Sequence, residues 1–446
     1  MIISVSKLGY AKILPILDYA AQRRGGRGKS ATSMKEDDYI QHMVVTSNHA
    51  TVLCFTNVGK VYRLKVYEVP QASRGAKGRP MVNLLPLDDN ETITAILPVI
   101  DAPKKFKERL ADFKAFVKTN AAQLQTNEVI NSHFAALESA LAESEDGADD
   151  ISDALRVQLK ELGLALSTTD LDDDIINDFA QQAEAVRKNF YVFMATEYGT
   201  IKRVELEQFS NVRSNGLRAI ELNGDDTLIG VAITDGEQQI MLFSNEGKAI
   251  RFAETDVRSM GRSAKGVRGM RVTIGASQVE DVEDVDVESD DEDATEANFI
   301  SRIVSLVVVP ETGEVLCASA NGYGKRTPVD DFPTKKRGGK GVIAIKTSER
   351  NGELVGAVAI DASKELMLIS DGGTLVRTRA SEVAQTGRNA QGVRLIRLAE
   401  DKKLVGVEAI EAVEDELEIL ENTESAADDV TDAQEAEKDD DNTVEE

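Results

Sequence analysis

Six short segments of the chain combine arginine and lysine with glycine, which are the residue types that bind phosphate groups. Arginine and lysine neutralise phosphates without reading base sequence, and glycine lets main-chain amides approach an anion closely. The candidate residues are Gln22, Arg23, Arg24, Gly25, Gly26, Arg27, Gly28 and Lys29 in the first segment, then Arg74, Lys77 and Arg79, then Arg213 and Arg218, then Arg262, Lys265 and Arg268, then Lys336, Arg337 and Lys340, and finally Arg388 and Arg394. This chemistry suits the backbone of a nucleic acid.

The six segments occupy the same place in a repeat of roughly fifty residues. Each repeat contains an apolar run that ends in Ser or Thr, and a glycine follows three positions later. These hairpin glycines are Gly9, Gly59, Gly199, Gly247, Gly322 and Gly373. A second glycine lies 19 residues further on in five repeats and 17 in one. These second glycines are Gly28, Gly78, Gly216, Gly266, Gly341 and Gly392. A basic residue also follows each hairpin glycine by three or four positions.

Short apolar runs bounded by turn signals predict that each repeat is built of β-strands. Examples are the runs 52–56, 191–196, 239–244, 314–319 and 365–370. A glycine in the connection permits the positive φ of a tight hairpin. One such unit cannot bury both of its faces, whereas six around an axis can. We therefore expect an all-β, propeller-like ring of six blades, with the basic segments on one rim.

Residues 101–189 interrupt the repeats and carry a different pattern. Their apolar residues recur at helical spacing: Phe106, Leu110, Phe113, Phe116 and Val117, then Phe134, Leu137 and Leu141, then Leu155, Leu159, Leu162 and Leu166. Ser152 is placed to cap the third helix, and Asp172, Asp173 and Asp174 are typical of a helix start. We predict a small helical bundle inserted after the second blade.

The formal net charge of −26 argues at first against a polyanionic partner. The acidic residues are concentrated, however. Residues 278–298 contain eleven acidic and no basic side chains, 411–446 contain seventeen and one, and 101–189 contain eighteen and ten. The remaining body has 41 basic and 32 acidic residues, a net charge of +9. We expect the segments 278–298 and 411–446 to be disordered. The acidic tail is expected either to compete with DNA for the basic rim or to tune its binding; the alternative is a tail that only makes the chain more soluble.

The other candidate sites are weak. Gly28-Lys29-Ser30 resembles the end of a phosphate-binding P-loop, but Arg23 stands where that motif needs glycine. The three histidines, His42, His49 and His133, have no cysteine or acidic cluster at ligand spacing, so no metal is predicted. Cys54 and Cys317 lie in apolar runs and are expected to be buried thiols. The sequence has no apolar stretch of about 18 residues, and no membrane partner is expected.

The first basic segment, 22–29, resembles without a gap the gyrase A box of the C-terminal domain of the DNA gyrase A protein. The six basic units and the acidic tail are also similar to that family, over residues 1–100, 190–278 and 299–410. The resemblance implies a six-bladed β-pinwheel in which the box helps to close the ring. The related topoisomerase IV protein typically lacks an intact box, so gyrase is favoured. The alternatives are that topoisomerase IV domain and a propeller that binds protein.

The family's function implies that duplex DNA is wrapped around the rim in a positive, right-handed sense. The holoenzyme, two gyrase A and two gyrase B chains, then introduces negative supercoils and uses ATP and Mg²⁺ elsewhere, so no cofactor is expected on this chain. Its partners would be double-stranded DNA, the gyrase B protein and the N-terminal part of the gyrase A protein, in the bacterial cytoplasm. The family's catalytic tyrosine follows an arginine, and none of the eight tyrosines here does, so this chain is not expected to cleave DNA.

The resemblance and the charge pattern together predict the domain organisation. Blades 1 and 2 occupy residues 1–100, the helical insertion 101–189, blades 3 to 6 residues 190–410, and the acidic tail 411–446. Because the chain begins at the first strand of the first blade, a C-terminal fragment or a split gene is expected.

Overall fold

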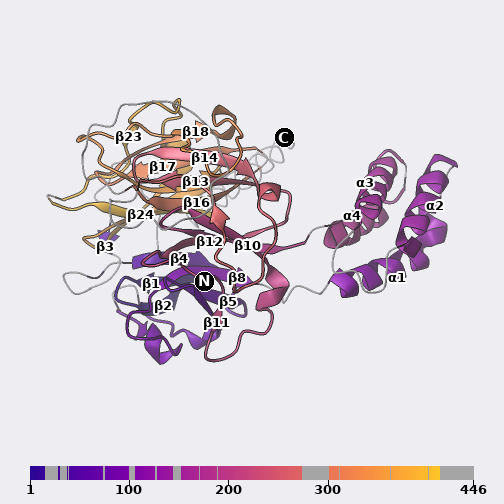
Figure 1. Ribbon diagram of the computed structural model, residues 1–446, viewed down its shortest axis with the longest axis horizontal. Helices are drawn as coiled ribbons and strands as arrows, with labels where there is room; N and C mark the ends of the chain where they lie inside the picture. Colours follow the sequence, from indigo (N-terminus) through magenta and orange to yellow (C-terminus); the bar gives the residue numbers. More distant parts are fainter. Residues whose placement is uncertain are drawn as a thin grey trace, which may run out of the picture.

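The computed structural model describes residues 1–15, 29–30, 38, 40–73, 76–99, 106–125, 128–143, 152–169, 171–187, 189–273, 301–310, 312–361, 363–399 and 401–411. The predicted disorder of 278–298 and of the tail beyond residue 411 lies outside these residues. The described residues form six sheets and one insertion of helices (Figure 1), as the sequence predicts.

Each of the six sheets has four antiparallel strands, and the sheets are blades 1 to 6 in chain order. A central hairpin forms the middle of every blade: β1 (Ile2–Ser6) and β2 (Tyr10–Leu14), β5 (Thr51–Thr56) and β6 (Lys60–Lys65), β9 (Tyr191–Thr196) and β10 (Thr200–Glu205), β13 (Gln239–Ser244) and β14 (Lys248–Ala253), β17 (Glu314–Ser319) and β18 (Tyr323–Pro328), and β21 (Lys364–Ser370) and β22 (Thr374–Arg379). The five runs predicted as strands all coincide with the first strand of a hairpin to within one residue.

The third strand of each blade lines the axis of the ring. These inner strands are β4 (Ile40–Val45), β8 (Ile93–Val99), β12 (Leu228–Thr234), β16 (Ile303–Val309), β20 (Leu354–Ile360) and β24 (Leu404–Glu411). Successive inner strands contact each other all the way round, including β24 with β4. The opposite edge of every sheet therefore faces outward.

The outer edge is a two-residue strand that each blade receives from the next repeat. These outer strands are β7 (Arg79–Pro80), β11 (Leu217–Arg218), β15 (Val267–Arg268), β19 (Val342–Ile343), β23 (Val393–Arg394) and β3 (Lys29–Ser30). The strand β7 from repeat 2, for example, pairs with β2 of blade 1. Short 3-10 turns connect the elements: η2 (Val66–Glu68), η3 (Met81–Asn83), η4 (Leu206–Phe209), η5 (Glu254–Asp256), η6 (Val329–Asp331) and η7 (Ala380–Glu382).

The core of the ring consists of six apolar clusters, one between each pair of neighbouring blades. Side chains alternate between the faces of a strand, so Val52 and Cys54 pack towards blade 1 while Leu53 and Phe55 pack towards blade 3. This explains why the first hairpin strands are apolar throughout rather than alternating: both faces are buried against a neighbour.

The first and last blades close the ring. The outer strand β3 begins at Lys29, the last residue of the gyrase A box-like segment. It pairs with β22, with Lys29 opposite Leu375 and Ser30 opposite Thr374. Apolar residues of blade 1, such as Ile2, share a core cluster with Met367 of blade 6. The expected closure between first and last blades is therefore made by β3 and this cluster.

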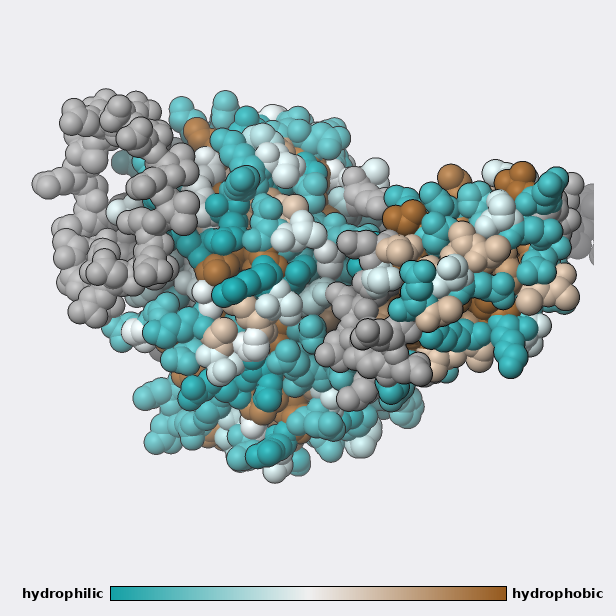
Figure 2. All heavy atoms as spheres, turned by 45° about the vertical axis from the view of Figure 1, so that its right-hand side comes forward, coloured by the Kyte–Doolittle hydropathy of each residue, from teal (hydrophilic) through white to brown (hydrophobic). Residues whose placement is uncertain are grey.

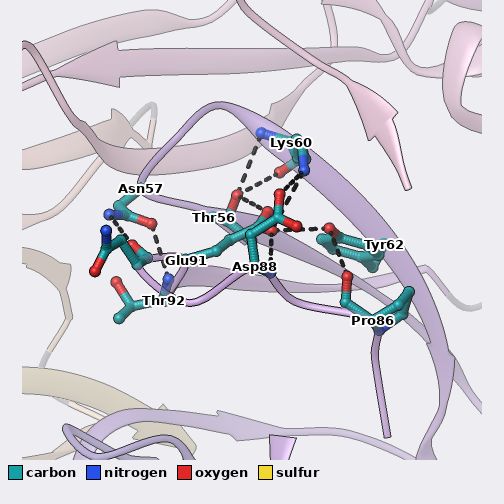
Figure 3. Close-up of polar contacts among 9 residues, drawn as sticks. Thr56, Asn57, Lys60, Tyr62, Pro86, Asp88, Glu91 and Thr92 are labelled. Atoms are coloured by element: carbon teal, nitrogen blue, oxygen red, sulfur yellow. Dashed lines mark hydrogen bonds and ion pairs between the residues drawn. The ribbon is translucent and has the colours of Figure 1, made fainter. Parts of the chain in front are cut away.

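In four of the six blades the Ser or Thr before the hairpin glycine acts as a turn cap. In blade 2 the Thr56 hydroxyl accepts a hydrogen bond from the Lys60 amide (3.3 Å) and donates one to the buried Glu91 carboxylate (2.7 Å), as Figure 3 shows. Ser6, Thr196 and Ser370 accept the same bond from the amide four residues later. The recurrent Ser/Thr-x-x-Gly pattern thus stabilises a hairpin turn.

The second glycine lets the chain cross to the neighbouring blade. Gly78 has φ +85°, and a Cβ placed there would lie 2.2 Å from the main-chain oxygen of Ala11 in blade 1. Added Cβ atoms at the other described second glycines also meet neighbouring protein atoms closer than 3 Å. The steric requirement for glycine at these positions is therefore the approach of the neighbouring strand, whereas the sequence suggested the approach of an anion.

The helical insertion contains α1 (Phe106–Leu124), α2 (Glu128–Glu143), α3 (Asp153–Leu166) and α4 (Asp173–Arg187), which lie to one side of the sheets in Figure 1. As predicted, Ser152 caps α3: its hydroxyl accepts a hydrogen bond from the Leu155 amide (3.2 Å). The helices share one core, in which Phe113 and Phe179 make an edge-to-face contact. Among the described helices, none combines the length and apolar composition that a membrane crossing requires.

Candidate nucleic-acid interface

We call the predicted basic segments rim loops 1 to 6: residues 22–29, 74–79, 213–218, 262–268, 336–341 and 388–394. Their described residues lie at the outer edges of the blades. Each rim loop runs into an outer strand. Of rim loop 1 the structure describes Lys29 only, so the box residues 22–28 remain a sequence prediction, as does Arg74 of rim loop 2.

Most of the described rim cations are exposed to solvent: Lys77, Arg79, Arg213, Arg218, Lys265, Arg268, Lys336, Lys340 and Arg394. Arg262, Arg337 and Arg388 are half-buried. The structure therefore brings the predicted cations to one outer surface of the ring, at intervals set by the blades. Figure 2 shows hydrophilic side chains covering much of the ring on the face that is visible there.

Two of the half-buried arginines also bind the protein. The Arg337 guanidinium donates to the carbonyl oxygens of Arg268 (2.9 Å) and Asp256 (3.1 Å). The Arg388 guanidinium donates to the carbonyl oxygen of Ile343 (3.2 Å). Each arginine thus links its own rim loop to the outer strand before it, a role that the sequence did not reveal.

Main-chain hydrogen bonds continue this link along rim loops 3 to 6. The Glu221 amide, just after rim loop 3, donates to the carbonyl oxygen of Ala264 in rim loop 4 (3.3 Å). The Arg271 amide donates to Gly339 (2.9 Å), and the Lys346 amide donates to Ala390 (3.2 Å). These loops form a connected band, so their cations are held at a fixed spacing.

In blades 4 and 5 the basic residue four positions after the hairpin glycine stabilises the fold. Arg251 donates to the carbonyl oxygen of Phe332 (3.2 Å), and Arg326 donates to that of Val383 (2.7 Å). Both acceptors belong to the following repeat, ten residues after its hairpin glycine. These arginines therefore join neighbouring repeats, and they are not part of the outer cationic surface.

A cationic pocket of about 370 Å³ lies beside rim loop 6, and sequence reasoning missed most of it. Its lining residues are Asn321, Arg394, Ile396, Arg397, Leu398 and Lys402. Lys403 donates a hydrogen bond to the Asn321 side chain (2.6 Å). A sequence signal existed, because Arg397, Arg271 and Lys346 each stand five residues after a second glycine.

Tyr323 lies beside this pocket between two arginines. The guanidinium of Arg350 lies 4.8 Å and that of Arg394 5.4 Å from its ring centre. Arg394 also donates to the phenol oxygen (2.9 Å). This hydrogen bond, with that of Arg350, lowers the pKa of the phenol below its usual value. The surroundings are therefore electropositive and favour an anion.

Cys54, Cys317 and His42 lie within strands of the blades. Cys54 and Cys317 are buried free thiols, as predicted, and this burial raises the pKa of both thiols to about 12. His42 lies within β4, and burial lowers its pKa to about 4. Among the described residues, no three His, Cys, Asp or Glu side chains gather as metal ligands would.

The fold and its outer loops define a closed six-bladed β-pinwheel with a cationic outer edge. Six segments match the family model described as the DNA gyrase C-terminal domain, β-propeller: 1–47, 50–100, 191–235, 238–277, 313–361 and 364–411. The chain belongs to this DNA gyrase C-terminal domain family.

Relatives and solved structures agree with this assignment. The chain is 44% identical over 413 residues to the DNA gyrase A protein of Pseudomonas aeruginosa, covering 92% of this chain and 37% of that protein. It is 38% identical over 431 residues to the Escherichia coli gyrase A protein, again covering 37% of that protein and 96% of this chain. It thus spans little more than a third of these relatives' length.

Two solved structures share the fold. A DNA gyrase A C-terminal domain superposes with a TM-score of 0.61 at 22% identity, covering 92% of this chain and 99% of that one. A DNA topoisomerase IV C-terminal domain superposes with a TM-score of 0.55 at 19% identity, covering 92% and 93%. At these identities the likeness concerns the fold alone.

Proposed function

We propose that this chain binds duplex DNA along the outer edge of the ring and bends it around the blades, as the wrapping module of a bacterial gyrase. The complete enzyme, with the gyrase B protein and the N-terminal part of the gyrase A protein, would use ATP to introduce negative supercoils in the cytoplasm. This chain would supply the wrap and leave strand cleavage, ATP and Mg²⁺ to the other parts.

The proposal rests on one observation: each blade receives its outer strand from the next repeat, which we call strand exchange. Because every outer strand is entered through a rim loop, exposed cations recur at the outer edge of successive blades. Cations on a convex, closed surface neutralise phosphates along a curved duplex and require no base contacts. The similarity to gyrase A proteins favours gyrase over topoisomerase IV.

A topology assay tests the wrap directly. Nicked circular DNA is incubated with the chain at low salt and sealed with ligase, and the linking number is then measured. We expect positive writhe to be trapped in proportion to bound protein. The same assay is run on the chain truncated after Ile410, because the acidic tail should compete for the rim and its removal should strengthen binding. No trapped writhe with either form would contradict the proposal.

The pocket beside rim loop 6 should contribute to DNA binding. We expect the double variant Arg397→Gln/Lys402→Gln to reduce the slope of log affinity against log salt by about 1.8, since each lost phosphate contact removes about 0.9. The control, Lys107→Gln/Lys118→Gln on exposed positions of α1, makes the same charge change away from the rim. Equal slopes for the two variants would exclude the pocket from the interface.

A further inference from the structure

Three lysines are buried beneath alternate rim loops. Lys12, Lys202 and Lys325 each stand three residues after a hairpin glycine, in blades 1, 3 and 5, and they are at most 2% exposed. Lysine is rarely buried because its charged ammonium loses hydration. These positions therefore require a compensating interaction.

Each ammonium group donates to at least one main-chain carbonyl of the next repeat, in its rim loop or in the residue that leads into it. Lys12 donates to Ala76 (2.8 Å), and Lys202 donates to Arg262 (2.5 Å) as well as to Ala219 (2.8 Å). Lys325 donates to Gly387 and Arg388 (both 2.7 Å). Within the described residues, neither Lys202 nor Lys325 forms an ion pair with a carboxylate.

This arrangement orients the loops. A carbonyl that bonds an ammonium from below points towards the core, which leaves the outer side of the loop to its cationic side chains. The buried charge also adds positive potential beneath the DNA path, in surroundings where water screens it weakly. Rim loops 2, 4 and 6 are held in this way.

The other three blades show that lysine is not needed to build the blade. Blades 2, 4 and 6 carry Tyr62, Ile250 and Val376 at the same position, and all three are buried. In Figure 3 the Tyr62 hydroxyl donates to Glu91 (2.9 Å) and lies 3.3 Å from the Pro86 carbonyl, so it holds its own repeat instead. A side chain without charge therefore fits this site.

We propose that Lys12, Lys202 and Lys325 are positioning residues that hold rim loops 2, 4 and 6 from beneath in the conformation that binds the DNA backbone. This proposal rests on the proposed wrapping function. The lysines do not touch DNA; they act through the loop carbonyls that they bind.

The titration of two of these lysines supports the assignment. Burial, the main cause, lowers the pKa of Lys202 and Lys325 to about 8. Arg262 lowers and Glu221 raises the pKa of Lys202. For Lys325 the Cys317 thiol and Asp331 raise it and Arg388 lowers it. Lys202 and Lys325 should therefore lose their charge between about pH 7 and pH 9.

The test is the double variant Lys202→Ile/Lys325→Ile in the full chain, which copies the residue of blade 4. The matched control is Ile250→Val, which places the residue of blade 6 in blade 4. We expect the lysine variant to remain folded by circular dichroism and to bind DNA about tenfold more weakly, because each released loop must be ordered again on binding. The control should bind as the unchanged chain does.

A pH series that compares the unchanged chain with the lysine variant separates positioning from a general structural effect. DNA affinity of the unchanged chain should fall from pH 7 to pH 9 by more than that of the lysine variant, because only the unchanged chain carries Lys202 and Lys325. A folded variant with unchanged affinity, or identical pH profiles, would overturn the proposal. If the unchanged chain itself traps no writhe and shows no salt dependence, the wrapping function fails instead.

Discussion

Replacing Gly392 by alanine is expected to lower the free energy of unfolding by about 3 kcal/mol or more. Gly392 has φ +85°, a conformation that costs an L-residue energy. A Cβ there would lie 2.5 Å from the main-chain oxygen and 2.7 Å from the carbonyl carbon of Gly324 in blade 5. Because these neighbours are main-chain atoms of a paired strand, they cannot rotate away, and strand β23 must leave the sheet.

The hairpin glycine Gly373 provides the control. It has a similar φ of +71°, but nothing lies within 4 Å of an added Cβ. Gly373→Ala should therefore show only the conformational cost, about 1 kcal/mol. Urea unfolding followed by circular dichroism measures both variants, and the difference between them isolates the close approach of neighbouring blades. Equal losses would mean that strand exchange does not depend on glycine at the crossing.

The predictable part of the fold is the local part. Ser/Thr-x-x-Gly at the end of an apolar run encodes a hairpin through contacts within five residues, as Thr56 and Lys60 show. The exchange of outer strands is different in kind. A strand of two residues, such as Val393–Arg394, has no measurable periodicity, and its partner lies in the preceding repeat. The offset between the two glycines, 19 residues in five repeats and 17 in one, marks the crossing in the sequence but does not show which strand the chain pairs with.

The candidate site likewise has a part that the sequence predicts and a part that it does not. The outer position of cations such as Arg218 followed from their phase in the repeat, because equivalent loops of a closed ring share one edge. The burial of Lys325 could not be read from its phase, since Arg326 beside it has the same residue character and a different environment. Which of the two lies under the rim loop depends on the path of the next repeat across the sheet.

The three arginines that end the outer strands β11, β15 and β23, namely Arg218, Arg268 and Arg394, should dominate the salt dependence of DNA binding. All three are exposed at the outer edge. We expect the triple change to glutamine to reduce the slope of log affinity against log salt by about 2.7, from about 0.9 for each phosphate contact. Trapped writhe should fall with it, because contacts on blades 2, 3 and 5 would be lost together.

The matching control changes three exposed lysines of the helical insertion, Lys107, Lys118 and Lys160, to glutamine. Both variants lower the net charge by the same amount, so a general electrostatic effect would weaken them equally. A rim that wraps DNA requires the arginine variant to lose slope and writhe while the lysine variant keeps both. If the lysine variant loses as much, DNA follows a path over the helical insertion rather than around the outer strands. If neither changes, phosphate contacts at the outer strands do not hold the duplex, and the proposed path around the ring is wrong.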